Sequence, residues 1–212
     1  MIITKFTDTN SLKVYVTDTY DQWDEITYKK LLLELPGFVQ SRIIDYNNWK
    51  DRQLRILGKL LLKQLLTDFG MPHLTSLQSL KFSDHNRPYF KDNIDFSTSH
   101  SGDKVICAAS INNRLGVDIE LVRDLDPLDH FCFLDASEIE LLKNSNDPIP
   151  SFYQLWTRKE AIAKANGFGV IESFDIENVK NNRKDVPKTN YVIEDLIIDS
   201  NYKGALVVGS EI

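Results

Sequence analysis

Two acidic side chains, Asp118 and Glu120, alternate with apolar Val117 and Ile119 in a short β-prone segment. Successive side chains on a strand point to opposite faces, so the two carboxylates would share one face about 7 Å apart. Carboxylates held that close repel each other unless a cation lies beside them. Mg²⁺ prefers oxygen ligands and usually also binds substrate phosphate oxygens. The pair therefore indicates either a magnesium site for phosphate chemistry or the solvated face of an edge strand.

A predicted helix over residues 151–165 carries a third candidate carboxylate, Glu160. One face of this helix carries, in order, Phe152, Trp156, Glu160 and Lys164. Because the two aromatic side chains should be buried, Glu160 continues a buried face and needs a partner. That partner is either Lys164, in an exposed i,i+4 pair worth about 0.2–0.5 kcal/mol, or a cation shared with Asp118 and Glu120.

Basic and hydroxyl-bearing residues in the first half of the chain suit an anion. A long predicted helix over residues 41–69 carries on its polar face Arg42, Lys50, Arg52, Arg55 and Lys59. A β-prone segment over residues 96–102 contains Ser99 and His100, and hydroxyl and imidazole groups bind phosphate oxygens well. The alternatives are a solvated helix face and a Ser/Thr-rich turn with a structural histidine.

The elements that must position these residues predict an α+β chain in two parts. The first part, residues 1–112, has expected strands over 2–6, 12–16, 80–83, 89–90, 96–102 and 104–110 and helices over 21–35 and 41–69. The second part, residues 113–212, has expected helices ending at Leu142 and spanning 151–165, and strands over 114–120, 173–179, 191–198 and 203–209. Asn112 and Asn113 predict a tight turn that pairs strand 114–120 with strand 104–110. Residues 180–189 form the expected mobile connection, and Asn166 with Gly167 should end the helix.

Composition narrows the class of protein. The 212 residues are 42% hydrophobic and carry a net charge of −6, which allows a packed core and argues against a general nucleic-acid binder. The first ten residues lack the pattern of a secretory signal, and no apolar run is long enough for a membrane span. The two cysteines, Cys107 and Cys132, form no disulfide framework or zinc motif, so we expect a reduced, cytoplasmic compartment.

Five motifs together resemble the signature of the 4′-phosphopantetheinyl transferases. They are Gly116-Val117-Asp118-Ile119-Glu120, Trp156-(x)₂-Lys159-Glu160-Ala161-(x)₂-Lys164, Asn86-Arg87-Pro88-Tyr89, Phe96-(x)₂-Ser99-His100-Ser101-Gly102 and Phe133-(x)₄-Glu138. Each motif alone is weak, whereas their order and spacing match the two-halved, surfactin-synthetase-activating (Sfp-like) type. The resemblance covers roughly residues 42–169.

The resemblance implies a fold and a reaction. The fold would be a monomer of two similar α+β halves related by a pseudo-two-fold axis, with coenzyme A as co-substrate in the cleft between them. The enzyme would transfer the 4′-phosphopantetheine group of coenzyme A to a serine of an apo acyl or peptidyl carrier protein. Adenosine 3′,5′-bisphosphate would leave, and Mg²⁺, or Mn²⁺ in its place, would assist.

The resemblance also implies residue roles. Asp118, Glu120 and Glu160 resemble the metal ligands, with Glu160 the candidate general base and Lys164 reaching the reacting phosphate. The residues that resemble coenzyme A contacts are Arg42 and Arg55 for the 3′-phosphate, Arg87 near the adenine nucleotide, and Ser99 and His100 for the diphosphate. Phe131 and Phe133 are candidates for carrier docking, with core packing as the alternative.

Two other classes of function stay open. The first is a non-catalytic relative that binds carrier proteins or coenzyme A without transferring anything. The second is an unrelated Mg²⁺-dependent phosphohydrolase that uses the same carboxylates. Intact Asp118, Glu120, Glu160 and Lys164 argue against the non-catalytic relative. Release of free phosphopantetheine or phosphate without a carrier would favour the phosphohydrolase.

Overall fold

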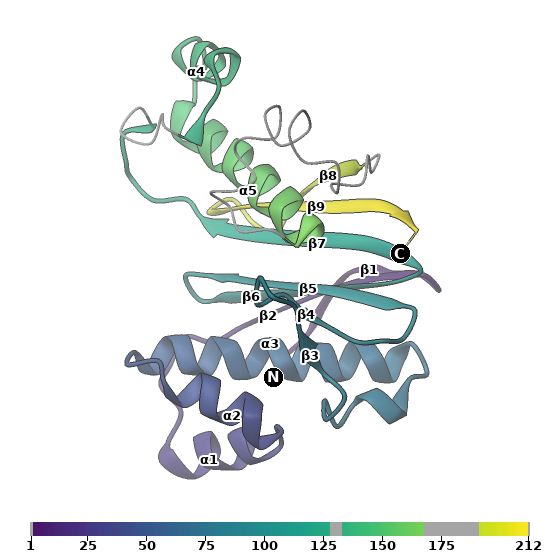
Figure 1. The fold of residues 1–212 in the computed structure, drawn as a ribbon. Coiled ribbons are helices and arrows are strands. Elements are labelled where there is room, and N and C mark those ends of the chain that lie inside the picture. Colours follow the sequence, from purple (N-terminus) through teal and green to yellow (C-terminus); the bar gives the residue numbers. More distant parts are fainter. Residues whose placement is uncertain (1, 128–132, 168–190, 212) are drawn as a thin grey trace. The chain divides into compact units, whose positions relative to one another are not determined.

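The computed structural model describes residues 2–127, 133–167 and 191–211 (Figure 1). The chain divides into two compact units, Met1–Asn112 and Asn113–Glu211. The mixture of helices and antiparallel strands agrees with the α+β expectation. No helix in the described part of the chain combines the length and apolar composition needed to cross a bilayer.

The first unit is built on one antiparallel sheet. Its strands are β1 (Thr4–Asp8), β2 (Leu12–Asp18), β5 (Ile94–Ser101) and β6 (Lys104–Ile111), in the order β1-β2-β6-β5. Helix α3 (Trp49–Asp68) packs on β2, β5 and β6 (Figure 1). Helices α1 (Glu25–Leu33) and α2 (Gly37–Ile44) pack in turn on α3. A 3₁₀ turn (Pro72–Leu74) and the short ladder of β3 (Lys81–Phe82) and β4 (Pro88–Tyr89) complete the unit.

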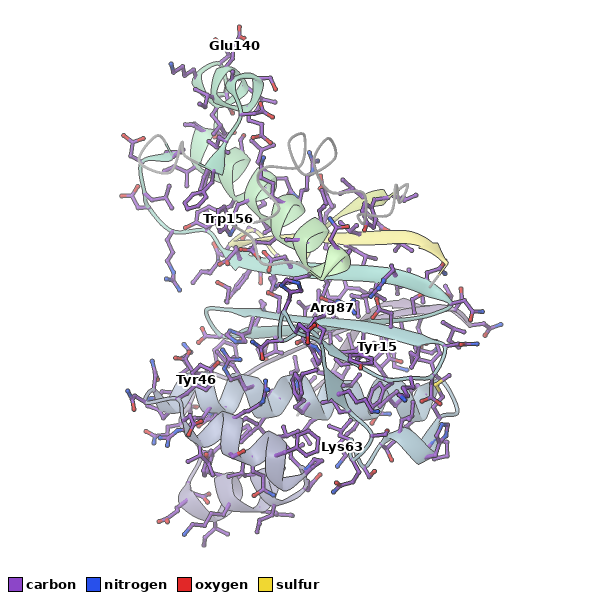
Figure 2. The ribbon with its side chains drawn as sticks, viewed as in Figure 1. Tyr15, Tyr46, Lys63, Arg87, Glu140 and Trp156 are labelled. Carbon is purple, nitrogen blue, oxygen red and sulfur yellow. The ribbon has the colours of Figure 1, made fainter. Side chains whose placement is uncertain are left out.

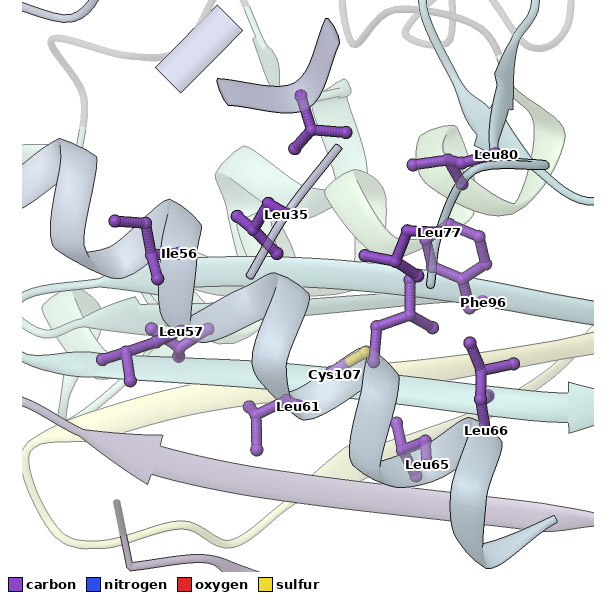
Figure 3. Close-up of a cluster of buried hydrophobic side chains, with 14 of the residues drawn as sticks. Leu35, Ile56, Leu57, Leu61, Leu65, Leu66, Leu77, Leu80, Phe96 and Cys107 are labelled. Carbon is purple, nitrogen blue, oxygen red and sulfur yellow. The ribbon is translucent and has the colours of Figure 1, made fainter. Parts of the chain in front are cut away.

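The core of the first unit lies between α3 and the sheet. Figure 3 shows leucine and isoleucine side chains of α3 beside Phe96 and Cys107 of the sheet. Leu61 and Leu65 are fully buried, as their helical spacing predicts. Cys107 is also fully buried, and burial raises the pKa of its thiol to about 12, so it is an inert core residue.

The single helix expected over residues 41–69 is wrong, because the structure has two helices there. Helix α2 ends at Ile44 and α3 begins at Trp49. The side chain of Asn48 accepts a hydrogen bond from the backbone N–H of Lys50 at 2.9 Å and so caps α3. Asparagine in this position favours a helix start over a helix interior, which explains the break.

The second unit is a three-stranded antiparallel sheet covered by one long helix. Its strands are β7 (Asn113–Leu121), β8 (Val192–Leu196) and β9 (Tyr202–Glu211), in the order β7-β9-β8. Helix α5 (Pro148–Asn166) packs on β7 and β9. It ends, as predicted, at Gly167, whose positive φ of 78° suits glycine. The shorter helix α4 (Ala136–Lys143) packs on α5.

The expected hairpin between strands 104–110 and 114–120 is wrong. Strand β6 pairs with β2 on one edge and β5 on the other, whereas β7 pairs with β9. Asn112 does adopt a left-handed conformation, with φ of 65°, but the chain there passes from one sheet to another. Strand 173–179, connection 180–189 and Phe131 lie outside the described residues.

Candidate active site

A close approach of helix α5 to strand β7 creates the acidic part of the site. A Cβ atom added to Gly116 would lie 1.9 Å from the carbonyl oxygen of Ala161 and 2.7 Å from the backbone nitrogen of Ala165. Only glycine therefore permits this packing. Residues 116, 118 and 120 share one strand face, so the face that touches α5 also carries the two acidic side chains of β7.

Asp118 is buried against the end of α5. The whole residue is 2% exposed, and its Oδ1 accepts a hydrogen bond from Nζ of Lys164 at 2.6 Å. Carboxylates are rarely buried unless paired, and this ion pair supplies the countercharge. Lys164, which the sequence offered as an i,i+4 partner of Glu160, thus forms an ion pair from helix to strand with Asp118.

Glu160 lies on the same helix, one turn before Lys164. Burial raises the pKa of its carboxyl to about 7, Lys164 opposes this shift, and the Asp118 and Glu120 carboxylates add to it. The four predicted residues therefore interact electrostatically. A carboxyl group that titrates near neutral pH suits a general base.

The carboxylates of Asp118, Glu120 and Glu160 are hard oxygen donors of the kind that Mg²⁺ prefers. Among the described residues, no group of three His, Cys, Asp or Glu side chains is already arranged around a metal position. Burial is the largest cause of the raised pKa of Glu160, and repulsion by Asp118 and Glu120, which a divalent cation would relieve, adds to it. The donor chemistry fits such an ion.

The N-terminal part of α5 is held in place by aromatic and ionic contacts. Trp156 stacks on Phe152, with ring centroids 6.2 Å apart, and meets Phe133 edge-on at 5.2 Å. Lys159 forms an ion pair with Glu138 at 2.9 Å. Glu138 also accepts from the backbone N–H of Asp135 and so completes the capping box of α4. Phe133 thus has a packing role within the second unit.

The first unit contains a cationic pocket of about 580 Å³. Its lining includes Arg42, Arg55, Lys59, Ser99 and His100, which come from α2, α3 and β5. The structure therefore brings together four residues predicted to bind coenzyme A and a lysine that the sequence placed on the polar helix face. Asp45 also lines the pocket and is its acidic member.

Aromatic rings hold the two pocket arginines. The Arg42 guanidinium lies 3.7 Å from the ring centre of Phe82, and that of Arg55 lies 3.7 Å from the ring centre of Tyr46. Burial lowers the pKa of Lys59, and the neighbouring Arg55 and Arg42 lower it further. No carboxylate in the described ranges forms an ion pair with Arg42, Arg55 or Lys59. Their charges therefore favour an anionic ligand.

Arg87 has an ion-pair partner of its own. Its Nη2 donates to Oδ2 of Asp95 at 2.7 Å, and both side chains are largely buried. Its neighbours Asn86 and Pro88 line the pocket. The structure thus places Arg87 in a buried pair beside the pocket, and its expected role at an adenine nucleotide stays a prediction.

Sequence reasoning missed the aromatic supports of the pocket. Tyr46 lies between two helices and Phe82 in a two-residue strand, and no spacing in the sequence connects either ring with an arginine. Sequence reasoning also missed why residue 116 must be glycine. The reason is the close approach of Ala161, which lies 45 positions later in the chain. Of these features, only the basic residues of the pocket could be recognised from the sequence.

Comparisons with known proteins agree with the motifs. A family model described as the 4′-phosphopantetheinyl transferase superfamily matches residues 114–207. The 4′-phosphopantetheinyl transferase gsp of Aneurinibacillus migulanus is 34% identical over 144 residues, 65% of this chain and 60% of the relative. A putative 4′-phosphopantetheinyl transferase of Haemophilus influenzae is 34% identical over 140 residues, 62% of this chain and 58% of the relative.

A more distant relative is the 4′-phosphopantetheinyl transferase Sfp of Bacillus subtilis, 27% identical over 136 residues, 60% of this chain and 59% of the relative. The chain thus covers about three fifths of the length of these curated relatives. The matched segment 114–207 contains the acidic strand and helix α5. The resemblance to the 4′-phosphopantetheinyl transferase superfamily that the motifs indicated is thereby confirmed for the matched segment.

Proposed function

We propose that this protein transfers the 4′-phosphopantetheine group of coenzyme A to a serine hydroxyl of an apo carrier protein. The observation that carries the proposal is the cluster of Glu160, with its pKa near 7, beside Asp118, Glu120 and Lys164. The names of the relatives support the same reaction. Because the chain covers only part of each relative, the activity is inferred from its own residues as well.

In the proposed reaction the serine oxygen forms a bond to the phosphorus that carries pantetheine. The bond from that phosphorus to the bridging oxygen breaks, and adenosine 3′,5′-bisphosphate leaves. Glu160 takes the serine proton, for which a pKa near neutrality is well matched. Asp118 keeps Lys164 in position, and in the proposed reaction the Lys164 ammonium donates a hydrogen bond to the reacting phosphate.

We propose Asp118, Glu120 and Glu160 as the ligands of Mg²⁺, or of Mn²⁺. When bound, such an ion neutralises diphosphate charge and stabilises the charge that develops on the phosphate oxygens. Two carboxylates on one strand face and a third on the adjacent helix provide oxygen donors without a competing soft ligand. Metal loss should therefore abolish transfer.

We propose that the cationic pocket binds the phosphates of coenzyme A. Arg42 and Arg55 would hold the 3′-phosphate, and Ser99 and His100 would bind the diphosphate. Lys59 would add a further positive charge, and Arg87 would lie near the adenine nucleotide. The absence of carboxylate partners for Arg42, Arg55 and Lys59 in the described residues supports this assignment.

The finer architecture belongs to the same proposal. Each unit has a long helix packed on an antiparallel sheet, α3 in the first and α5 in the second, which supports two similar halves related by a pseudo-two-fold axis. We propose that both units contribute to one coenzyme A site. The expected state is a cytoplasmic monomer whose partner is an acyl or peptidyl carrier protein, with no nucleic acid and no membrane involved.

Intact-protein mass spectrometry tests the reaction. Apo carrier proteins are incubated with this protein, coenzyme A and Mg²⁺, and a gain of one phosphopantetheine group is expected. Omission of the metal, or Glu160→Gln, should abolish the gain. Glu140→Gln is the matched control, because Glu140 is an exposed glutamate on α4 (Figure 2) and should keep full activity.

Other outcomes identify the alternatives. Binding of coenzyme A without modification of any carrier would favour the non-catalytic relative. Release of phosphopantetheine or phosphate in the absence of a carrier would favour the phosphohydrolase. Either result would overturn the transferase proposal.

A further inference from the structure

A second cavity, of about 310 Å³, lies in the first unit between α1, the segment before it, and the start of α3. Its walls include the indole rings of Trp23 and Trp49 and the phenol of Tyr28. Its polar lining includes Arg52 and Gln53. It shares no lining residue with the cationic pocket.

Two polar atoms on residues that line this cavity are buried without a hydrogen-bond partner in the described part of the chain. They are the Tyr28 hydroxyl and Nε of Arg52. The Arg52 guanidinium lies 5.6 Å from the ring centre of Tyr28, so the two groups are neighbours. Buried donors left unsatisfied are destabilising, and a ligand that accepts hydrogen bonds would satisfy both.

Three other polar residues of the cavity, Gln53, Glu25 and Lys29, are already engaged. The Gln53 side chain accepts from the backbone N–H of Trp23 at 2.7 Å and donates to the Asp21 carbonyl at 3.1 Å. Glu25 forms an ion pair with Lys29 at 2.6 Å. Because that pair is neutral overall, the Arg52 guanidinium gives the cavity a net positive charge. No described carboxylate forms an ion pair with Arg52.

We infer that this cavity binds a small aromatic carboxylate. The aromatic body would lie between the indole rings of Trp23 and Trp49. Its carboxylate would accept hydrogen bonds from Arg52 and the Tyr28 hydroxyl, which are the two unsatisfied donors. A volume of about 310 Å³ suits one ring with a short acidic side chain and is at the lower end for small-molecule sites.

The chemistry of this site differs from that proposed for coenzyme A. Arg52 and Lys59 lie seven residues apart on α3, roughly 10 Å along its axis. A bulky phosphate ester suits the cationic pocket, whereas two indole walls and one guanidinium suit a flat monoanion. The cavity would therefore bind its ligand whether or not the transferase proposal holds.

Isothermal titration calorimetry of the full chain with 3-phenylpropanoate tests this inference, with 3-phenylpropanamide as the neutral probe of the same shape. We expect saturable binding of the carboxylate, with a Kd of about 1 mM or tighter. The amide should bind about tenfold more weakly, because it lacks the charge that Arg52 recognises. Tryptophan fluorescence gives a second readout, since two of the three tryptophans line the cavity.

Variants assign the contacts. Arg52→Gln should weaken carboxylate binding at least about tenfold, and Tyr28→Phe, which removes one oxygen, should weaken it several-fold. Exposed Lys30→Gln on α1 is the control and should bind as the parent does. Circular dichroism confirms that each variant is folded. Absence of binding, equal binding of carboxylate and amide, or unchanged affinity in both folded Arg52→Gln and Tyr28→Phe would overturn the inference.

Discussion

The ammonium nitrogen of Lys164 lies 2.6 Å from Oδ1 of Asp118, and the carboxylate is only 3% exposed. This contact joins the last turn of α5 to the middle of β7. It therefore holds two proposed active-site groups at a fixed separation. It also makes each charge depend on the other for its stability in a buried position.

Removal of Lys164 should destabilise the protein. In Lys164→Met the Asp118 carboxylate stays buried without its lysine, and the free energy of unfolding should fall by about 2–4 kcal/mol. The double variant Asp118→Asn/Lys164→Met should recover part of this loss, and neither should transfer phosphopantetheine. Urea unfolding measures both changes, with exposed Lys143→Met as the control. A strictly additive double variant would contradict the coupling.

Glu160→Gln should increase stability where Glu160 is charged. Folding raises the pKa of Glu160 from 4.5 to about 7, so the folded state keeps a proton that the unfolded chain releases over this interval. The contribution of protonated Glu160 to the free energy of unfolding is complete below about pH 4.5 and is lost as the pH rises to about 7. Metal-free Glu160→Gln should therefore be about 1–2 kcal/mol more stable than the parent at pH 8, after allowance for partial exposure.

The pH dependence is the diagnostic part of that prediction. The advantage of Glu160→Gln should shrink toward pH 4.5, as measured by urea unfolding in a chelating buffer. Equal advantages at pH 5 and pH 8 would contradict a raised pKa. The same variant should be inactive as a transferase, so the site would sacrifice stability for a usable base.

Magnesium should stabilise the folded protein. A cation among Asp118, Glu120 and Glu160 would relieve their repulsion, and a concentration tenfold above its Kd would add about 1.4 kcal/mol. Thermal unfolding with and without Mg²⁺ should show the gain in the parent and in Glu140→Gln. Glu120→Gln should reduce it. A shift that is equal in all three proteins would indicate binding elsewhere.

Gly116→Ala should disrupt the second unit. The added Cβ would lie 1.9 Å from the Ala161 backbone, so α5 must move away from β7, at a cost of at least about 3 kcal/mol. Gly37→Ala is the matched control, because its added Cβ would meet no atom within 4 Å. Calorimetric unfolding should show a large loss of stability in Gly116→Ala and little change in Gly37→Ala. A Gly116→Ala protein as stable as Gly37→Ala would show that the close approach is absent.

Loss of a pocket arginine should affect one phosphate of coenzyme A. Arg55→Gln should raise KM for coenzyme A about tenfold, because a charge-assisted contact to the 3′-phosphate is removed. The same change should have little effect on KM for 3′-dephospho-coenzyme A. Lys30→Gln provides the surface control. Equal losses with both substrates would place Arg55 at another part of the nucleotide.

Local patterns were sufficient to predict the strand and the helix that carry the candidate acidic site. The alternation of Val117 with Asp118 and the four-residue spacing from Trp156 to Glu160 are short-range features, and the structure retains both. The pairing of β7 could not be predicted from them. A turn at Asn112 suggests a hairpin, but the sequence does not reveal that β2 and β5 occupy both edges of β6.

The pocket illustrates the same limit. Charges at Arg42 and Arg55 are visible in the sequence, and their helical spacing suggests a shared face. Their aromatic supports, Phe82 and Tyr46, join through tertiary contacts that no local period encodes. The break at Asn48 was missed, because the weak local preference of a capping residue competes with a strong leucine periodicity on one side.

The distribution of strands has a consequence for how the gene could be divided. Every described sheet draws all its strands from one side of Asn112, so no ladder would be severed by a cut there. Each polypeptide fragment would carry its own complete set of strand partners. Two separately translated pieces, 1–112 and 113–212, are thus the natural starting point for a split, reassembling version of the protein, with reconstitution dependent on the concentration of both.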